Sequence, residues 1–265
     1  MTLRSVLFVP GSRPERFHKA LAAGASAVII DLEDAVSPSD KDSARESLRR
    51  WLDVARPVML RINAADSAWY ADDLSLCGLA GVSAVMLPKA ERADTLAAVQ
   101  RAGAKRLVPL VETAAGFAAL GAIAAAPGVI CLAFGSIDLQ VDLGLRDALE
   151  DELLFYRSQI VLASRLAGIG APLDGVSTAI DDAARLAADV QRARRLGFAG
   201  KLCIHPRQVA AVNLGFTPTA DEQAWAQRVI AASAAAGGAA VTVDAKMVDK
   251  PVLLRAEAIL REASD

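Results

Sequence analysis

Short apolar runs alternate along the chain with segments of helical periodicity. Runs rich in Val, Ile and Leu that end at Gly, Pro or charged residues are typical of buried parallel strands. We identify eight such runs, the seventh of them the weakest, at residues 5–9, 27–32, 57–62, 84–87, 107–111, 129–134, 172–175 and 200–204. The pattern therefore predicts a parallel sheet whose faces are covered by helices.

The segments between these runs carry apolar residues at helical spacing. They predict six helices, at residues 14–23, 39–54, 92–102, 113–126, 150–167 and 181–196. The last is followed by Gly197, a residue that commonly ends helices. Eight strands alternating with helices in a chain of 265 residues predict an α/β fold, a (β/α)₈ TIM barrel.

The pattern changes beyond about Val212. A helix is expected up to Ala236, followed by a Gly-Gly break and a closing helix after Pro251. We therefore expect the barrel to occupy residues 1–215 and a C-terminal helical extension to occupy 216–265. Because such a short extension buries little surface by itself, we expect it to act as a lid that packs on a neighbouring subunit.

Composition narrows the class of protein. Apolar residues make up 54% of the chain and the net charge is −2, which gives no reason to expect nucleic acid or an anionic membrane as a partner. The three cysteines lack metal-ligand spacing, and Met1 leads directly into the first strand, so we expect a cytoplasmic protein without a signal peptide. The uncharged stretch 113–137 is long enough to span a bilayer, but its glycines and Pro127 favour a helix, a turn and a strand.

Two carboxylates follow neighbouring strands of the predicted barrel. Glu112 follows the fifth strand and Asp138 the sixth, and the carboxyl ends of barrel strands share one rim. Carboxylate oxygens suit Mg²⁺, which retains several waters. Gly135 and Ser136 allow the backbone to approach a ligand closely. The alternative for each carboxylate is a helix cap or a surface charge.

Arg61 lies within an apolar strand, where an unpaired charge is costly. The guanidinium matches a substrate carboxylate, and an internal ion pair with Glu33 or Asp34 is the alternative. Asp31, Glu33 and Asp34 put three carboxylates at one strand end, which requires a nearby cation. We expect them to orient waters bound to a metal.

The remaining candidates are basic. The segment 10–19 is a glycine turn that opens a basic helix, a weak signal for phosphate that matches neither a P-loop nor a dinucleotide fingerprint. His18 is more typical of a surface residue. His205 follows the eighth strand, where it fits either the rim or a structural hydrogen bond.

The chain resembles the citrate lyase beta subunit and malyl-CoA lyase family, also called the HpcH/HpaI aldolase family. The matching motifs occur in order over nearly the whole chain: LFVPGSRPERFHKA at Leu7–Ala20, VIIDLEDAV at Val28–Val36, LRIN at Leu60–Asn63, LPKAE at Leu87–Glu91, VETAAG at Val111–Gly116, GSIDLQVDLG at Gly135–Gly144, GFAGKLCIHPRQV at Gly197–Val209 and KMVDKP at Lys246–Pro251.

The resemblance implies roles for individual residues. It implies Mg²⁺, with Mn²⁺ as a substitute, held by Glu112 and Asp138, and a 2-oxo acid gripped by Arg61. It places Arg13 and Lys19, together with His205 at the rim, at the coenzyme A thioester. Asp249 matches an aspartate that a neighbouring subunit's tail inserts over the active site of a homotrimer or a dimer of trimers. Ala245 replaces the usual glycine before that motif, which predicts a stiffer lid hinge.

The expected function is a Mg²⁺-dependent carbon–carbon lyase. It would cleave citramalyl-, malyl- or citryl-CoA reversibly to acetyl-CoA and a 2-oxo acid, with Asp249 as general acid/base. One alternative is a citrate lyase beta subunit that acts on an acyl-carrier-protein thioester within a multi-subunit complex. Another is a Schiff-base aldolase that uses Lys89 or Lys201.

Overall fold

The computed structural model describes residues 3–237 and 239–264; residues 1, 2, 238 and 265, which the predicted domain ranges include, lie outside the described residues. Contacts divide the described chain into two compact units. One spans Leu3–Asn213 and the other begins at Leu214. Each unit is described by itself.

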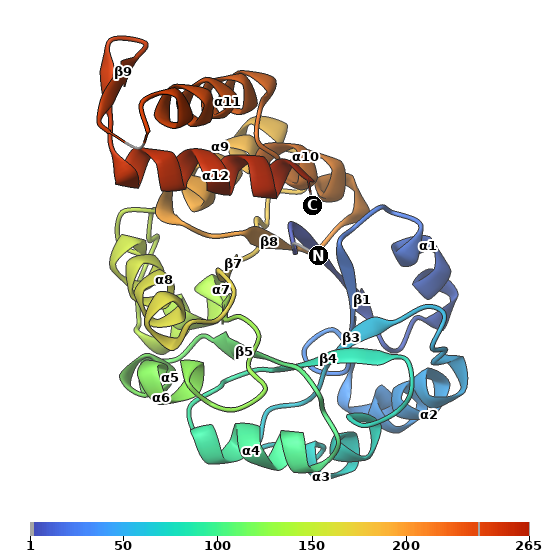
Figure 1. Ribbon diagram of the computed structural model, residues 1–265. Helices are drawn as coiled ribbons and strands as arrows, with labels where there is room; N and C mark the ends of the chain where they lie inside the picture. The colour runs from blue at the N-terminus through green and yellow to red at the C-terminus, as the bar shows by residue number, and fades with distance from the viewer. Residues whose placement is uncertain (1–2, 238, 265) are drawn as a thin grey trace. The chain divides into compact units, whose positions relative to one another are not determined.

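The first unit is a closed barrel of eight parallel strands in the order of the sequence, which confirms the predicted (β/α)₈ fold. Figure 1 shows the strands as a ring surrounded by helices. The strands are β1 (Ser5–Pro10), β2 (Ala27–Asp31), β3 (Val58–Arg61), β4 (Val82–Leu87), β5 (Leu107–Val111), β6 (Ala133–Phe134), β7 (Leu173–Asp174) and β8 (Gly200–Cys203).

The helices that follow the barrel strands vary in length. They are α1 (Phe17–Leu21), α2 (Lys41–Trp51), α3 (Tyr70–Asp73), α4 (Ala93–Arg101), α5 (Ala114–Ala118), α6 (Leu120–Ala124), α7 (Ser136–Asp142), α8 (Leu154–Ala167), α9 (Ala183–Leu196) and α10 (Pro206–Phe216), with 3₁₀ turns at η1 (Pro14–Arg16), η2 (Pro38–Asp40) and η3 (Leu74–Leu76). The predicted helix at 113–126 is divided at Ala119, and the sequence pattern missed α3, α7 and α10.

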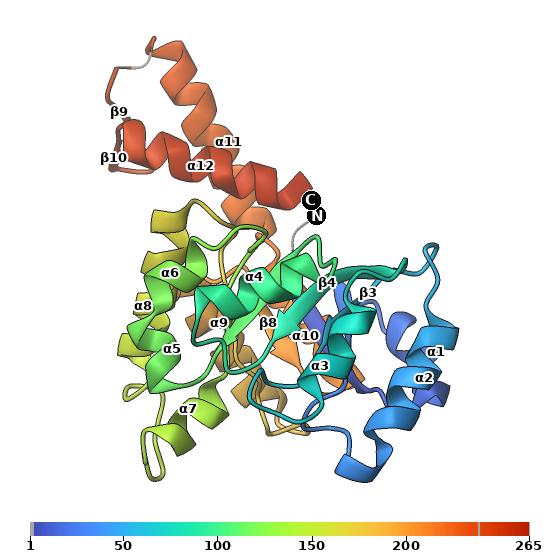
Figure 2. The ribbon, with the colours of Figure 1, turned by 90° about the horizontal axis from the view of Figure 1, so that it is seen from below.

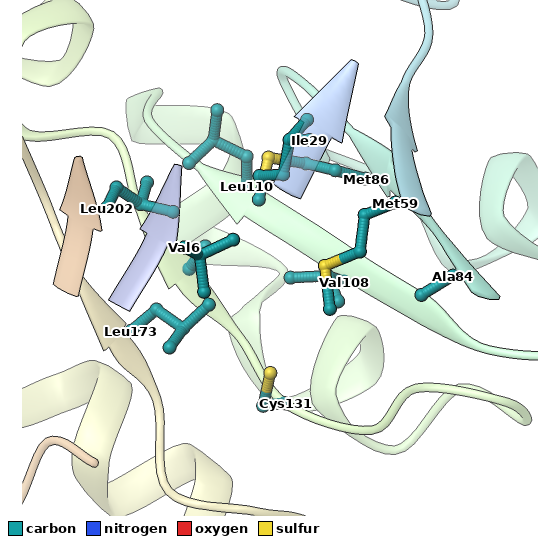
Figure 3. Close-up of a cluster of buried hydrophobic side chains, with 11 residues drawn as sticks. Val6, Ile29, Met59, Ala84, Met86, Val108, Leu110, Cys131, Leu173 and Leu202 are labelled. Carbon is teal, nitrogen blue, oxygen red and sulfur yellow. The ribbon is translucent and has the colours of Figure 1, made fainter. Parts of the chain in front are cut away.

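A buried apolar cluster occupies the barrel interior, and all eight strands or their immediate flanks contribute to it (Figure 3). Its members are Val6, Ile29, Met59, Ala84, Met86, Val108, Leu110, Cys131, Ala133, Leu173 and Leu202. Because side chains alternate across a strand, the residues on either side of each member point toward the surrounding helices. The interior is therefore packed, and chemistry is restricted to the ends of the strands.

The second unit contains α11 (Ala220–Ala235), β9 (Val241–Val243), β10 (Lys246–Val248) and α12 (Lys250–Ser264). Figure 2 shows α11 and α12 packed side by side, with the short hairpin at one end. Thr219 and Glu222 form a capping box at the start of α11. The sequence analysis predicted both helices but missed the hairpin.

Ala245 lies in the two-residue turn of this hairpin. Asp244 and Ala245 have φ values of 50° and 59°, as a type I′ turn requires. Glycine is favoured at such positions because a β-carbon makes the left-handed region costly. The departure noted in the sequence therefore falls at a strained turn position.

The uncharged stretch 113–137 folds as α5, α6 and β6 of the barrel unit. Among the described residues, every helix is too short or too polar to cross a membrane.

Candidate active site

A cavity of about 390 Å³ lies at the carboxyl ends of the barrel strands. Residues in the last part of β1, β2, β5, β6 and β8, or just after β2, β5, β6, β7 and β8, line it, together with Arg61 at the last position of β3. The lining residues are Phe8, Pro10, Asp31, Asp34, Ala35, Arg61, Leu110, Glu112, Phe134, Gly135, Ser136, Ile137, Asp138, Val176, Leu202 and Ile204. Most of the candidates that the sequence places on the rim therefore meet in one cavity.

Glu112 is a buried carboxylate of the cavity, with 2% of its surface exposed. Its Oε1 accepts a hydrogen bond of 2.8 Å from the backbone N–H of Lys89, a residue held in the left-handed region at φ 45°. Burial, with the charges of Glu33 and Asp138, raises the pKa of Glu112 to about 8, and Lys89 N–H and Arg61 oppose that rise. A carboxylate under this penalty favours a bound cation.

Gly135 makes room for Glu112. A β-carbon at Gly135 would lie 2.3 Å from Glu112 Oε2 and 2.4 Å from its Cβ. The N–H of Gly135 donates to Val111 O at 3.0 Å, which holds the two strand ends together. The next residue, Ser136, begins α7, and Asp138 lies in the first turn of that helix. Asp138 therefore enters the cavity from a helix N-terminus, and its side chain is exposed to it.

Arg61 makes an internal ion pair, the alternative left open by the sequence. The strand register places Asp31 directly opposite Arg61. Nε donates to Asp31 Oδ1 at 2.7 Å and Nη2 to Oδ2 at 2.6 Å, while Nη1 lies 2.8 Å from Glu33 Oε2. Burial lowers the pKa of Arg61, but the charges of Asp31 and Glu33 outweigh it and the net shift is upward.

The partners of Arg61 differ in one respect from the ion pair with Glu33 or Asp34 that the sequence suggested. Asp31, rather than Asp34, takes the two-donor grip, and Asp34 is an exposed residue of the cavity wall. Asp31 is held in turn by the N–H groups of Glu33, at 2.9 Å, and Ala35, at 3.2 Å. Of the five N–H groups of Arg61, three face Asp31 and Glu33, which leaves two for a ligand.

The residues present fit a hard divalent cation. Glu33 Oε2 is buried and makes no hydrogen bond within the described residues, and burial raises the pKa of Glu33 to about 7. Across residues 3–237 and 239–264 no cluster of three or more His, Cys, Asp or Glu side chains is placed to hold a metal. Two carboxylates in an open cavity match Mg²⁺, which needs few protein ligands because it retains waters.

The structure separates Lys201 from this cavity. Leu202 belongs to the barrel interior, so its neighbour Lys201 points into the layer between barrel and helices. Its Nζ donates to Gly175 O at 2.5 Å, lies 3.7 Å from Asp174 and borders a different cavity of about 440 Å³. Lys89 approaches the site through its backbone, and its side chain is exposed.

The predicted coenzyme A contacts are surface residues. Arg13 pairs with Glu15 at 2.5 Å, and Lys19 is exposed on α1. The ring of His205 accepts a hydrogen bond of 3.1 Å from the N–H of Arg207 at the start of α10, so the structural hydrogen bond foreseen as an alternative is present. In the second unit, Asp249 Oδ1 accepts from Val252 N at 3.3 Å at the start of α12.

Sequence reasoning missed two contributors to the site. The guanidinium of Arg61 lies 4.8 Å from the ring centroid of Phe8, a cation–π arrangement that shields it from water. Lys41 on α2 is 5% exposed and bonds the segment that carries Glu33. The strand register could have revealed Asp31 as the partner of Arg61, whereas Lys41 carries no local signal in the sequence.

Comparison with known proteins agrees with this geometry. The model of the HpcH/HpaI aldolase/citrate lyase family matches residues 4–206. This chain belongs to that family. The resemblance seen in the sequence is therefore confirmed, and so is the prediction of an enzyme of a lyase family.

Individual relatives of this family member cover nearly its whole length. A citrate lyase subunit beta-like protein of Mycobacterium tuberculosis is 41% identical over 98% of this chain and 95% of its own. A (3S)-malyl-CoA thioesterase of Cereibacter sphaeroides is 35% identical over 98% and 94%. The crystal structure of CitE from M. tuberculosis with magnesium, acetoacetate and coenzyme A matches with a TM-score of 0.87 and 40% identity, over 100% of this chain and 99% of that one.

Proposed function

We propose that this chain is a Mg²⁺-dependent carbon–carbon lyase. It cleaves a 3-hydroxyacyl-CoA such as citramalyl-, malyl- or citryl-CoA, reversibly, to acetyl-CoA and a 2-oxo acid. The observation that carries the proposal is that Glu112, Asp138 and Arg61 line one cavity at the strand ends. The relative solved with magnesium, acetoacetate and coenzyme A supports it, because magnesium and coenzyme A are among the ligands that this reaction requires.

Glu112 and Asp138 would hold the metal, with Mn²⁺ as a substitute. When bound, Mg²⁺ supplies a Lewis acid that polarises the oxygen of the forming carbonyl. Glu33 and Asp34 would orient the waters around the metal, and Glu33 lies within reach of this role because its carboxylate is held against Arg61 of the cavity wall.

Arg61 would bind the carboxylate of the 2-oxo acid with its two remaining N–H groups. The ion pair with Asp31 fixes the plane of the guanidinium, so little side-chain entropy is lost when the acid binds. Gly135 and Ser136 line the cavity beside Asp138, where they would contact the acid. Arg13, Lys19 and His205 would contact the coenzyme A moiety.

Asp249 would exchange the proton with the thioester enolate, as a general acid/base does. We propose that it does so in a neighbouring subunit of a homotrimer or a dimer of trimers, where residues 216–265 act as a lid. A lid delivered in this way excludes water and completes the site only after the thioester is bound.

An assay of the purified chain tests the reaction. Citramalyl-, malyl- and citryl-CoA are supplied with Mg²⁺ or with EDTA, and the products are separated by chromatography. Acetyl-CoA and a 2-oxo acid, formed only with Mg²⁺, are expected. Free coenzyme A and a hydroxy acid would show a thioesterase instead, and cleavage restricted to acyl-carrier-protein thioesters would show a complex subunit. Inactivation by borohydride together with resistance to EDTA would favour a Schiff base on Lys89.

A further inference from the structure

Lys41 is a buried cation that is not among the residues lining the cavity. Its Nζ donates three hydrogen bonds, to Leu32 O at 2.7 Å, to Glu33 O at 2.8 Å and to Asn63 Oδ1 at 2.6 Å. An ammonium has three N–H groups, so this hydrogen-bonding capacity is fully used. The ring of Trp69 lies 4.9 Å from Nζ. Because removing one partner from a buried, hydrogen-bonded charge is costly, the ammonium of Lys41 ties together the segments that carry its three acceptors.

The two segments that Lys41 joins leave the barrel side by side. The ladder between β2 and β3 has its last pair at Asp31 and Arg61, and Leu32 N donates to Arg61 O at 2.9 Å just beyond it. Past this point the carbonyls of Leu32 and Glu33 have turned away from the sheet toward Lys41. The side chain of Asn63, two residues beyond Arg61, accepts the third bond of the same ammonium.

This anchoring fixes both partners of Arg61. The backbone of Glu33 is held by Lys41 on one side, while its carboxylate lies against Arg61 on the other. The N–H of Glu33 also donates to Asp31, so the conformation that Lys41 holds is the one in which Asp31 is oriented for its two-donor grip. We infer that Lys41 is a positioning residue, which sets the orientation of Arg61 toward the 2-oxo acid through Asp31 and Glu33. The inference rests on the proposed function.

Asn63 extends the network away from the site. Its N–H and its amide group donate to Asp73 Oδ2, and Asp73 Oδ1 accepts from Arg45 at 3.0 Å. Arg45 lies one helical turn after Lys41 on α2 and is buried to a similar degree, but it makes no contact with the carbonyls of Leu32 or Glu33 among the hydrogen bonds of the described residues. Arg45 is therefore the control, because its loss removes a buried cation from the same helix and leaves the bonds of Lys41 to the carbonyls of Leu32 and Glu33 in place.

The test compares Lys41→Met, Lys41→Arg and Arg45→Met with the wild type. Lys41→Arg retains the positive charge for folding, but a guanidinium cannot direct three N–H groups from one atom onto three acceptors. Calorimetry with Mg²⁺ measures the dissociation constant of pyruvate, and a separate titration measures that of Mg²⁺. Hydrogen exchange of the peptide 31–36 measures the order of the anchored segment without any ligand.

Both Lys41 variants should raise the dissociation constant of pyruvate at least tenfold and that of Mg²⁺ less than threefold, because Glu112 is held separately by Lys89 N–H. Exchange of peptide 31–36 should become at least tenfold faster in both. Arg45→Met should lower the melting temperature. The dissociation constants of pyruvate and Mg²⁺ and the exchange rate of peptide 31–36 should all stay within twofold of wild type.

Two results overturn the inference. One is a folded Lys41→Arg protein with unchanged exchange and unchanged pyruvate affinity. The other is an Arg45→Met protein in which exchange of peptide 31–36 accelerates and pyruvate affinity falls as much as in the Lys41 variants. The effect would then be general destabilisation. A wild-type protein that binds no 2-oxo acid would contradict the proposed function instead, and the exchange data would still decide whether Lys41 orders the segment.

Discussion

Gly135 and Glu112 share a space that has no room for one more carbon atom. A β-carbon at Gly135 would lie 2.3 Å from Glu112 Oε2, well inside van der Waals contact. The glycine is thus required by the carboxylate across from it, since Gly135 itself has an ordinary negative φ of −91°. The close approach between two strand ends sets the position of the proposed metal ligand.

Substitution of this glycine should therefore damage the metal site and spare the fold. In Gly135→Ala the carboxylate of Glu112 must move, and we expect Mg²⁺ affinity to fall at least tenfold in a calorimetric titration. Gly121→Ala is the matched control, because a β-carbon there meets no atom within 4 Å. Equal Mg²⁺ affinity in both variants would show that the carboxylate has another position from which it can bind.

Arg61 should be sensitive to the shape of its side chain as well as to its charge. Arg61→Ala leaves Asp31 buried and unpaired, which we expect to cost about 3–5 kcal/mol of stability. Arg61→Lys keeps a charge near Asp31 and should lose less stability. It cannot reproduce the planar grip, so its kcat/KM for the 2-oxo acid should still fall about 100-fold. Denaturation and steady-state kinetics measure the two effects, and near-normal kcat/KM in the lysine variant would make Arg61 a purely structural residue.

Metal-free protein should lose stability as the pH rises. The pKa values of Glu112 and Glu33 are raised from 4.5 to about 8 and about 7, so the folded state binds more protons than the unfolded state between those limits. Their contribution to stability is complete below pH 4.5 and is lost as the pH rises through 7 to 8. Urea denaturation in EDTA at several pH values measures this. Glu112→Gln should show a smaller decline, and an identical decline in the two proteins would contradict the assignment.

Asp249 should affect the rate rather than the binding of the metal or the acid. Removal of a general acid/base typically lowers kcat by about 100-fold to 10,000-fold, and we expect this of Asp249→Asn. If the lid works between subunits, a mixture of Asp249→Asn and Glu112→Ala subunits regains part of the activity that each parent lacks. Lack of recovery after verified subunit exchange would mean that the tail serves its own barrel or has no catalytic role.

Much of the fold could be predicted because strand and helix periods differ along this chain. Of the strand predicted at 129–134, only the last two residues form β6. Val129 forms an isolated bridge to Leu107. Helix α7 was missed because its residues follow a buried strand directly and have no helical spacing of their own before Leu139.

The site was predicted in part for a similar reason. Glu112, Asp138 and Arg61 could be identified from the sequence because each lies at the end of an apolar run or just after it. The two-donor pair of Arg61 with Asp31 depends on strand register, and the anchoring by Lys41 depends on how α2 packs. Such long-range relationships are absent from the local pattern, so the sequence alone could not reveal them.

The most direct test of the account is a calorimetric titration of Mg²⁺ in the presence of saturating pyruvate. Wild type is compared with Glu112→Ala, Asp138→Ala and the control Asp94→Ala, whose exposed carboxylate pairs with Arg92 away from the cavity. We predict binding in wild type and in the control, and none in the Glu112 and Asp138 variants, although all four proteins remain folded. Unchanged Mg²⁺ affinity in either the Glu112 or the Asp138 variant would contradict the assignment of the metal site.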